Sequence, residues 1–123
     1  MTTTPFDPSS VASIREHFAL IADEKWITGD FFLDAGPTCG CAAGHYVQLQ
    51  FPGVRLAFPP ARRFVRLTNT VKQFMRQTAG EQWGLYSVND GHCPFYSQPT
   101  PKARILALLD DMLAGGITHL NPL

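Results

Sequence analysis

Apolar residues recur every three or four positions in several stretches of the chain, the spacing that places side chains on one face of a helix. The first stretch is an apolar stripe that consists of Val11, Ile14, Phe18 and Ile21. It follows an Asp-Pro-Ser-Ser segment at residues 7–10, where Asp7 or Ser10 can cap a helix and Pro8 suits its first position. The pattern therefore predicts a helix from this segment to about Glu24.

Three further stretches predict helices. The second helix begins near Cys39 or Cys41 and continues to about Gln50, because a Pro-Gly pair then stops it. The third spans roughly residues 61–78 and has the clearest apolar face in the chain, formed by Phe64, Leu67, Val71, Phe74 and Met75. The last begins at a Thr-Pro pair and ends before two glycines, and its stripe consists of Ile105, Leu106, Leu109, Met112 and Leu113.

The segments between these helices predict loops, turns and short extended pieces. Residues 83–88 have the bulky and β-branched content of a short strand, although six residues leave open whether residues 83–98 form a strand or a loop. Asn89-Asp90-Gly91 is a turn signal. Residues 31–33 are either extended or a buried turn, and residues 35–38 have the composition of a loop. We therefore expect an α-rich fold, mainly α, with about four helices and one or two short strands.

Length and composition fit one domain. With 123 residues, 45% of them hydrophobic, the chain can form one core and is too apolar for disorder throughout. We expect a single compact domain over residues 1–123, with residues 1–6 as a loose N-terminal arm. No apolar run approaches the roughly 18 residues that span a bilayer, and no secretory signal pattern begins the chain. Three cysteines, an odd and low number, favour free thiols, so we expect a cytoplasmic protein without a membrane partner.

Charge is balanced overall but unevenly distributed. Ten basic residues match ten acidic ones, so the net charge is zero and allows self-association into a homo-oligomer. Residues 1–34 are net acidic, whereas residues 35–80 contain no acid and six bases. Five of these bases belong to the predicted helix 61–78 and are the candidate partner-binding residues: Arg62, Arg63, Arg66, Lys72 and Arg76.

This basic helix face has three interpretations. It can be a solvated face, because amphipathic helices need a polar side and Arg and Lys are good helix formers. It can bind an acidic protein partner. It can also bind nucleic acid through phosphate contacts, although the chain has no helix-turn-helix spacing, no aromatic-rich RNA-binding strand motif and no basic tail.

Three short motifs follow one another along the chain: Trp-Ile-Thr-Gly at residues 26–29, Cys-Ala-Ala-Gly at residues 41–44, and Asn89-Asp90 ahead of the last predicted helix. In order and spacing they resemble a family of small bacterial and phage proteins without an assigned activity. This chain differs in placing His45 after the second motif and in adding Cys39 and the His92-Cys93 pair. The resemblance implies a context of phage and mobile-element accessory genes, and no mechanism.

The cysteines and histidines suggest a candidate metal site. Zinc takes four thiolate or imidazole ligands in a tetrahedron, and the chain offers five candidates: Cys39, Cys41, His45, His92 and Cys93. Cys41 and His45 would share a helix face. The spacing of Cys39 and Cys41 is tighter than in a zinc knuckle. Adjacent residues such as His92 and Cys93 normally point apart, so we expect at most one of them to join the site. The alternative is that Cys41 is a small buried core residue.

The same residue types also permit a cysteine nucleophile. Cys39 or Cys41 at a helix N-terminus could be the nucleophile, with His92 as base and Asn89 or Asp90 as orienting group. The simpler interpretation makes residues 89–91 a turn and His92 a surface residue. Phosphate-binding loops, dinucleotide-binding glycine motifs, zinc-protease motifs and the serine-hydrolase elbow are all absent from the sequence.

The sequence hypothesis is therefore a small, cytosolic, non-enzymatic protein that binds a macromolecular partner. One concrete form is a phage accessory protein that inhibits a host or defence protein. The first alternative is a zinc- or thiol-dependent site, either a metal-stabilised module or an enzyme with a cysteine nucleophile. The second alternative is nucleic-acid binding through the basic residues 62–76.

Overall fold

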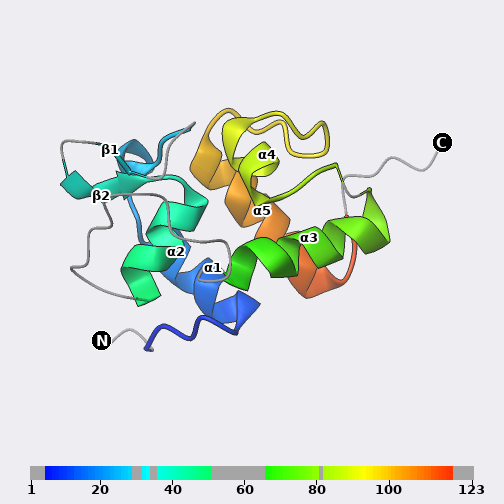
Figure 1. Ribbon diagram of the computed structural model, residues 1–123, viewed down its shortest axis with the longest axis horizontal. Helices are drawn as coiled ribbons and strands as arrows, with labels where there is room; N and C mark the ends of the chain where they lie inside the picture. The colour runs from blue at the N-terminus through cyan, green and yellow to red at the C-terminus, as the bar shows by residue number, and fades with distance from the viewer. Residues whose placement is uncertain (1–4, 29–31, 34–35, 51–65, 81, 118–123) are drawn as a thin grey trace.

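The computed structural model describes residues 5–28, 32–33, 36–50, 66–80 and 82–117 (Figure 1). This part of the chain is mainly helical, which confirms the predicted α-rich class. None of its helices is both long and apolar enough to cross a membrane. The elements in chain order are α1 (Val11–Ala19), the 3-10 helix η1 (Asp23–Lys25), β1 (Phe32–Leu33), β2 (Gly36–Gly40), α2 (Ala42–Gln50), α3 (Arg66–Thr78), α4 (Leu85–Asp90) and α5 (Pro101–Ala114).

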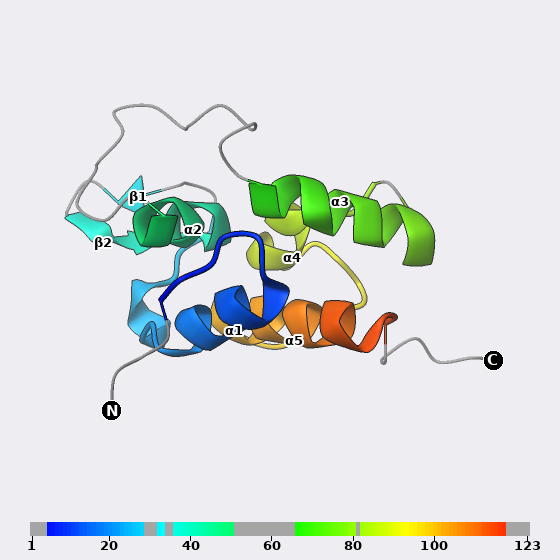
Figure 2. The ribbon, with the colours of Figure 1, turned by 90° about the horizontal axis from the view of Figure 1, so that it is seen from below.

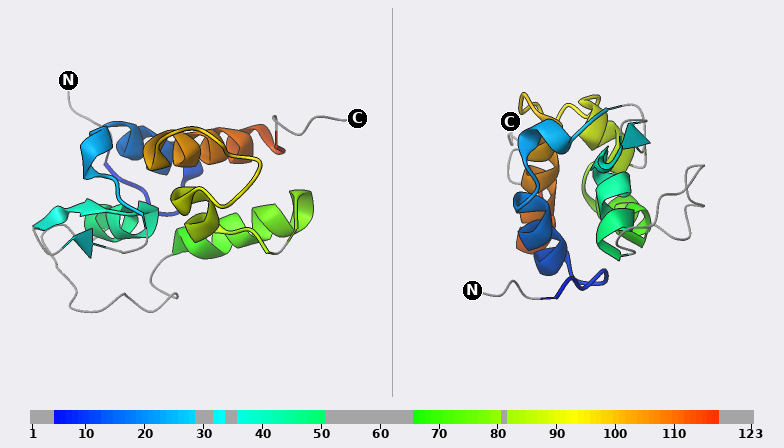
Figure 3. Two further views of the ribbon diagram at one scale, coloured as in Figure 1. Left: turned by 90° about the horizontal axis from the view of Figure 1, so that it is seen from above. Right: turned by 90° about the vertical axis from the view of Figure 1, so that its left-hand side faces the viewer.

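The helices form two layers, which Figures 2 and 3 show from three sides. α1 and α5 lie side by side in one layer, while α2, α3 and α4 form the other. The core lies between the layers and contains Phe18 and Leu108 from the first, and Tyr46, Val71 and Leu85 from the second. The short helix α4 contacts α2, α3 and α5, so it packs against helices of both layers.

Hydroxyl caps fix the starts of α1 and α5. Of the two caps predicted for α1, Ser10 is the one used, so Pro8 precedes the helix instead of occupying its first position. The Ser10 Oγ accepts a hydrogen bond from the Ser13 N–H at 3.2 Å, and the Thr100 Oγ1 accepts one from the Ala103 N–H at 3.1 Å. α5 ends at Ala114, and the left-handed φ of 88° at the next residue, Gly115, closes the helix. α1 ends at Ala19, earlier than predicted, and the chain then turns through η1.

The sequence leaves residues 83–98 open between a strand and a loop, and neither alternative is right for their first part, because α4 (Leu85–Asp90) is a helix. Leu85, Val88 and Asn89 are buried, and their spacing is that of a helical face rather than of an alternating strand. The turn signal marks the end of this helix, since Gly91 adopts a left-handed φ of 83° there. A six-residue helix is too short to show its period in the sequence.

Two further expectations need correction. The predicted loop at residues 35–38 overlaps β2, which pairs antiparallel with β1. Phe6 belongs to the predicted loose arm, yet its ring centroid lies 5.3 Å from that of His17 and 5.8 Å from that of Tyr46, so it packs on the core. Residues 1–4 of that arm lie outside the described residues. The same is true of residues 61–65, the first part of the third predicted helix.

Candidate functional site

The three sequence motifs meet at the side chain of Asn89. Its Oδ1 accepts a hydrogen bond from the Ala42 N–H at 3.0 Å, at the start of α2. Its Nδ2 donates to the Ile27 carbonyl at 2.9 Å and to the Asp90 Oδ1 at 3.0 Å. Because Asn89 is only 1% exposed, these bonds are shielded from water. Asn89 therefore has a structural role, because its side chain joins the segment after Trp26 to α2 and α4.

Arg104 of α5 binds the backbone of α4 next to Asn89. Its guanidinium donates to the Val88 carbonyl at 3.0 Å, the Asn89 carbonyl at 2.8 Å and the Gln98 carbonyl at 2.8 Å. Two of these carbonyls belong to the last turn of α4, where a helix leaves its carbonyl groups without partners. Arg104 was not among the residues predicted from the sequence. The sequence signal that could have identified it is the position of this arginine next to Ile105, on the apolar side of an amphipathic helix.

The structure places the candidate zinc and thiol residues in different surroundings. Cys41 and Cys93 are buried, whereas His92 is exposed. The His45 Nε2 lies 2.9 Å from the Lys25 carbonyl oxygen, and its ring lies 4.6 Å from the Trp26 ring between centroids. Cys39 belongs to β2, and its side chain lies outside the described residues. Within the described ranges, no three His, Cys, Asp or Glu side chains gather as a metal site.

Burial also affects the two described thiols chemically. It raises the pKa of Cys41 above its ordinary value, although the Gly44 and Ala43 N–H groups act in the opposite direction. Burial likewise raises the pKa of Cys93. A higher pKa leaves less thiolate at neutral pH, and the thiolate is the form that attacks electrophiles or binds metal. The zinc and thiol hypotheses stay predictions, and the side chain of Cys39 lies outside what the structure describes.

The basic face of α3 is exposed. Arg66, Lys72 and Arg76 point away from the core, while Leu67, Val71 and Met75 on the opposite side are buried. No acidic residue occurs in α3, so its polar side is basic along its whole length. Asn69 and Gln73 form a polar hollow together with Lys72 and Arg76. Arg62 and Arg63, the other two predicted partner-binding residues, lie outside the described residues.

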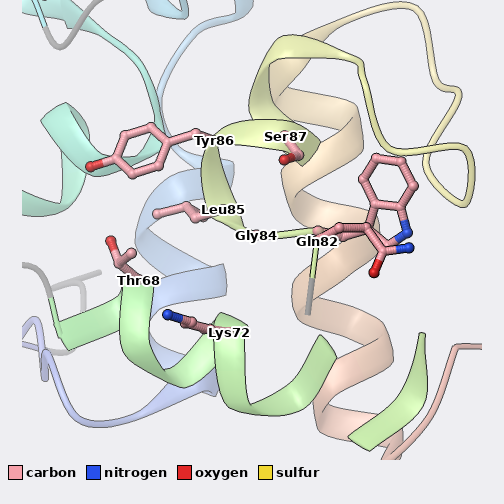
Figure 4. Close-up of a pocket in the computed structure, with 8 residues that line it drawn as sticks. Thr68, Lys72, Gln82, Gly84, Leu85, Tyr86 and Ser87 are labelled. Atoms are coloured by element: carbon pink, nitrogen blue, oxygen red, sulfur yellow. The ribbon is translucent and has the colours of Figure 1, made fainter. Parts of the chain in front are cut away.

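A pocket of about 250 Å³ lies between α3 and α4. Figure 4 shows Thr68 and Lys72 on its α3 side, facing Leu85 and its neighbours in α4. Lys72 also borders the polar hollow, so the pocket and the basic face adjoin each other. Among the described residues, the lining consists of Thr68, Lys72, Gln82, Trp83, Gly84, Leu85, Tyr86 and Ser87.

Thr68 has an unusual environment within this pocket. Its side chain is 9% exposed, and its Oγ1 has no hydrogen-bond partner in the part of the chain that the structure describes. Buried hydroxyl groups normally find a partner, because leaving one without a partner costs free energy. Thr68 was not predicted from the sequence either, and no local signal could identify it, because the pocket needs residues from two helices.

Comparison with known proteins adds no candidate residues to this site. The chain matches no protein-family model, no curated protein and no solved structure. The candidate site is therefore defined by its own geometry: the exposed basic face of α3 (Arg66, Lys72 and Arg76), the adjoining polar hollow, and the α3–α4 pocket with Thr68 inside it.

Proposed function

We propose that this protein acts without catalysis, by binding an acidic protein partner through the basic face of α3. The observation that carries the proposal is the composition of that helix. It has 13 residues, exposes Arg66, Lys72 and Arg76, and contains no acid. Its other face is fixed in the core, so the charges lie on a rigid support about 20 Å long, from the rise of an α-helix. Opposite charge on a partner would steer the encounter and fix its orientation.

The neighbouring pocket favours a protein partner over nucleic acid. Its walls include the half-buried Trp83, which offers apolar surface in the same pocket as Lys72. Protein interfaces combine an apolar centre with a polar rim. Interfaces with nucleic acid are more polar and more strongly basic. Mixed apolar and basic surface therefore fits a peptide segment better than a sugar-phosphate backbone.

The wider biological context is part of the same proposal. The order of the Trp-x-x-Gly, Cys-Ala-x-Gly and Asn-Asp motifs resembles small bacterial and phage proteins, which suggests an accessory protein of a phage or mobile element. In that setting, binding would block a host or defence protein in the cytoplasm. This context rests on the resemblance alone.

Selection from a random peptide library tests the proposal, because such a library offers acidic, basic and neutral sequences to the protein at once. We expect the immobilised protein to enrich peptides rich in Asp and Glu. The variant Arg66→Glu/Arg76→Glu should bind the enriched peptides about tenfold more weakly, a loss of about 1.4 kcal/mol. Lys25→Glu/Lys102→Glu is the matched control, because it changes net charge equally but away from α3.

Three outcomes would contradict the proposal. The first is enrichment without an acidic bias, and the second is equal loss of binding in both variants. The third is tighter binding to a short DNA duplex than to any selected peptide, with an affinity that falls steeply as salt rises. That last result would make nucleic acid the partner of this face.

A further inference from the structure

The α3–α4 pocket contains a polar group that the fold leaves without a partner. The Thr68 Oγ1 is buried, and none of the described residues accepts or donates a hydrogen bond there. A valine would fill nearly the same volume without this cost. Threonine at this position is therefore explained if a bound group supplies the missing hydrogen bond.

Lys72 adds a positive charge beside this hydroxyl group. Thr68 and Lys72 are four residues apart in α3, so they lie on the same face one turn apart. Figure 4 shows both side chains on the α3 side of the pocket. No acidic residue lines the pocket among the described residues. The polar end of the pocket thus offers one hydroxyl donor and one ammonium group.

The opposite wall is mainly apolar and the pocket is small. The half-buried Trp83 supplies apolar surface there, while Leu85 lies behind it with only 1% of its surface exposed. A volume of about 250 Å³ is below the usual range of roughly 300–1,000 Å³ for ligand and cofactor sites. It suits one amino-acid side chain better than a nucleotide or a cofactor.

We infer that this pocket binds the side-chain carboxylate of a glutamate that the acidic partner presents. The carboxylate would accept a hydrogen bond from the Lys72 ammonium and, once the side chains that enclose it move apart, another from the Thr68 hydroxyl. Its methylene groups would contact the half-buried Trp83. One ammonium group balances one carboxylate, whereas a phosphate monoester would bring nearly two charges. This inference rests on the proposed function and specifies which residue of the partner is recognised.

Titration with small peptides tests the pocket directly by NMR. The probe is N-acetyl-Leu-Glu-amide, and its uncharged counterpart is N-acetyl-Leu-Gln-amide. We expect the amide signals of Thr68, Lys72 and Ser87 to move with the glutamate probe, and the glutamine probe to bind about tenfold more weakly. Equal binding of the two probes, or shifts confined to other residues, would overturn the inference.

Two pocket variants and a control sharpen this test. Thr68→Val and Lys72→Met should each weaken binding of the glutamate probe about fivefold, roughly the loss of one hydrogen bond. Thr70→Val is the control, because Thr70 lies on the same helix outside the pocket and its Oγ1 already donates to the Arg66 carbonyl at 3.1 Å. Unchanged affinity in both pocket variants would remove the assignment.

The stability of the free protein gives an independent readout. Thr68→Val removes a buried hydroxyl group that has no partner among the described residues, so the melting temperature should rise in the absence of any ligand. Higher stability together with weaker binding is the signature of a group kept for a ligand. A lower melting temperature with unchanged binding would show that Thr68 has only a structural role.

Failure of this inference can be distinguished from failure of the proposed function. If the small probes do not bind but Arg66→Glu/Arg76→Glu still weakens the library-selected peptides, the basic face binds the partner and the pocket does not. If the glutamate probe binds but charge reversal has no effect on those peptides, the pocket inference stands. The basic face would then not be the interface.

Discussion

The side-chain oxygen of Asn89 accepts a hydrogen bond from the backbone N–H of Ala42 at 3.0 Å, across 47 positions of the chain. This contact supplies a partner for a backbone group at the start of α2, where a helix leaves its N–H groups without intrahelical acceptors. The usual source of such a partner is a side chain next to the helix. Here it comes from the opposite half of the chain, so α2 and α4 depend on each other.

Replacing Asn89 should therefore destabilise the whole fold. Asn89→Ala removes three hydrogen bonds and leaves the buried Ala42 N–H and the Ile27 carbonyl without a partner. We expect the free energy of unfolding to fall by about 3 kcal/mol. Urea unfolding followed by far-UV circular dichroism measures the change. Asn69→Ala, on the exposed face of α3, should change stability little, and a similar small effect in both variants would contradict this role.

Replacing Arg104 should destabilise the protein about as much as replacing Asn89. Arg104→Met keeps the length of the side chain but leaves three carbonyl groups without their guanidinium donor. We expect a loss of about 3 kcal/mol in the free energy of unfolding. Lys102→Met, two positions earlier in α5, is the control and should have an effect within about 0.5 kcal/mol. Near-equal melting temperatures for the two variants would show that the carbonyl groups find other partners.

The described thiols should react slowly in the folded protein. Burial raises the pKa of both Cys41 and Cys93, so little thiolate is present at pH 7. Brief treatment with iodoacetamide, followed by peptide mass spectrometry, should label both residues far less in buffer than in denaturant. Fast labelling of Cys41 in the folded state would instead support the cysteine-nucleophile hypothesis.

Stability should decrease at alkaline pH. The pKa values of Cys41, Cys93, Tyr46 and Tyr96 are all raised in the folded protein, chiefly by burial, and for Tyr96 also by its hydrogen bond to Asp111. The unfolded chain therefore releases these protons at a lower pH than the folded one. These groups contribute their full stabilisation at pH values below 9.0, the ordinary pKa of a cysteine thiol. The stabilisation is lost as the pH rises further.

A pH series of urea unfolding experiments tests this expectation. The free energy of unfolding should begin to fall near pH 9, where the cysteines of the unfolded chain ionise, and continue to fall through the tyrosine range. The variant Cys41→Ala/Cys93→Ala should lose the first part of this decrease and keep the second. Constant stability up to pH 11 would contradict the assigned direction of the shifts.

Features that depend on neighbouring residues were predictable from the sequence. Ser10 and Thr100 cap helices through bonds to residues three positions later, so a local pattern identifies them. The amphipathic character of α3 is likewise visible in the spacing of Leu67, Val71 and Met75. In each case the signal and its structural consequence lie within one or two helical turns.

Features that depend on distant residues were not predictable. The segment of α4 could not be recognised as a helix, because six positions show no clear period and its bulky residues are buried by other helices. Arg104 and Thr68 are defined by partners, or a missing partner, on other elements. The basic residues of the candidate site came from the charge pattern, whereas the pocket beside them exists only once α3 and α4 pack together.

The network around Asn89 and Arg104 has a consequence for hydrogen exchange. Ile27, Ala42, Asn89 and Arg104 come from four separate parts of the chain, yet one unbroken set of hydrogen bonds joins them. No part of this set can open without breaking bonds to the others. The amide protons of Ala42 and of the hydrogen-bonded residues in α4 and α5 should therefore exchange with deuterium with one common free energy of opening, that of unfolding the entire domain.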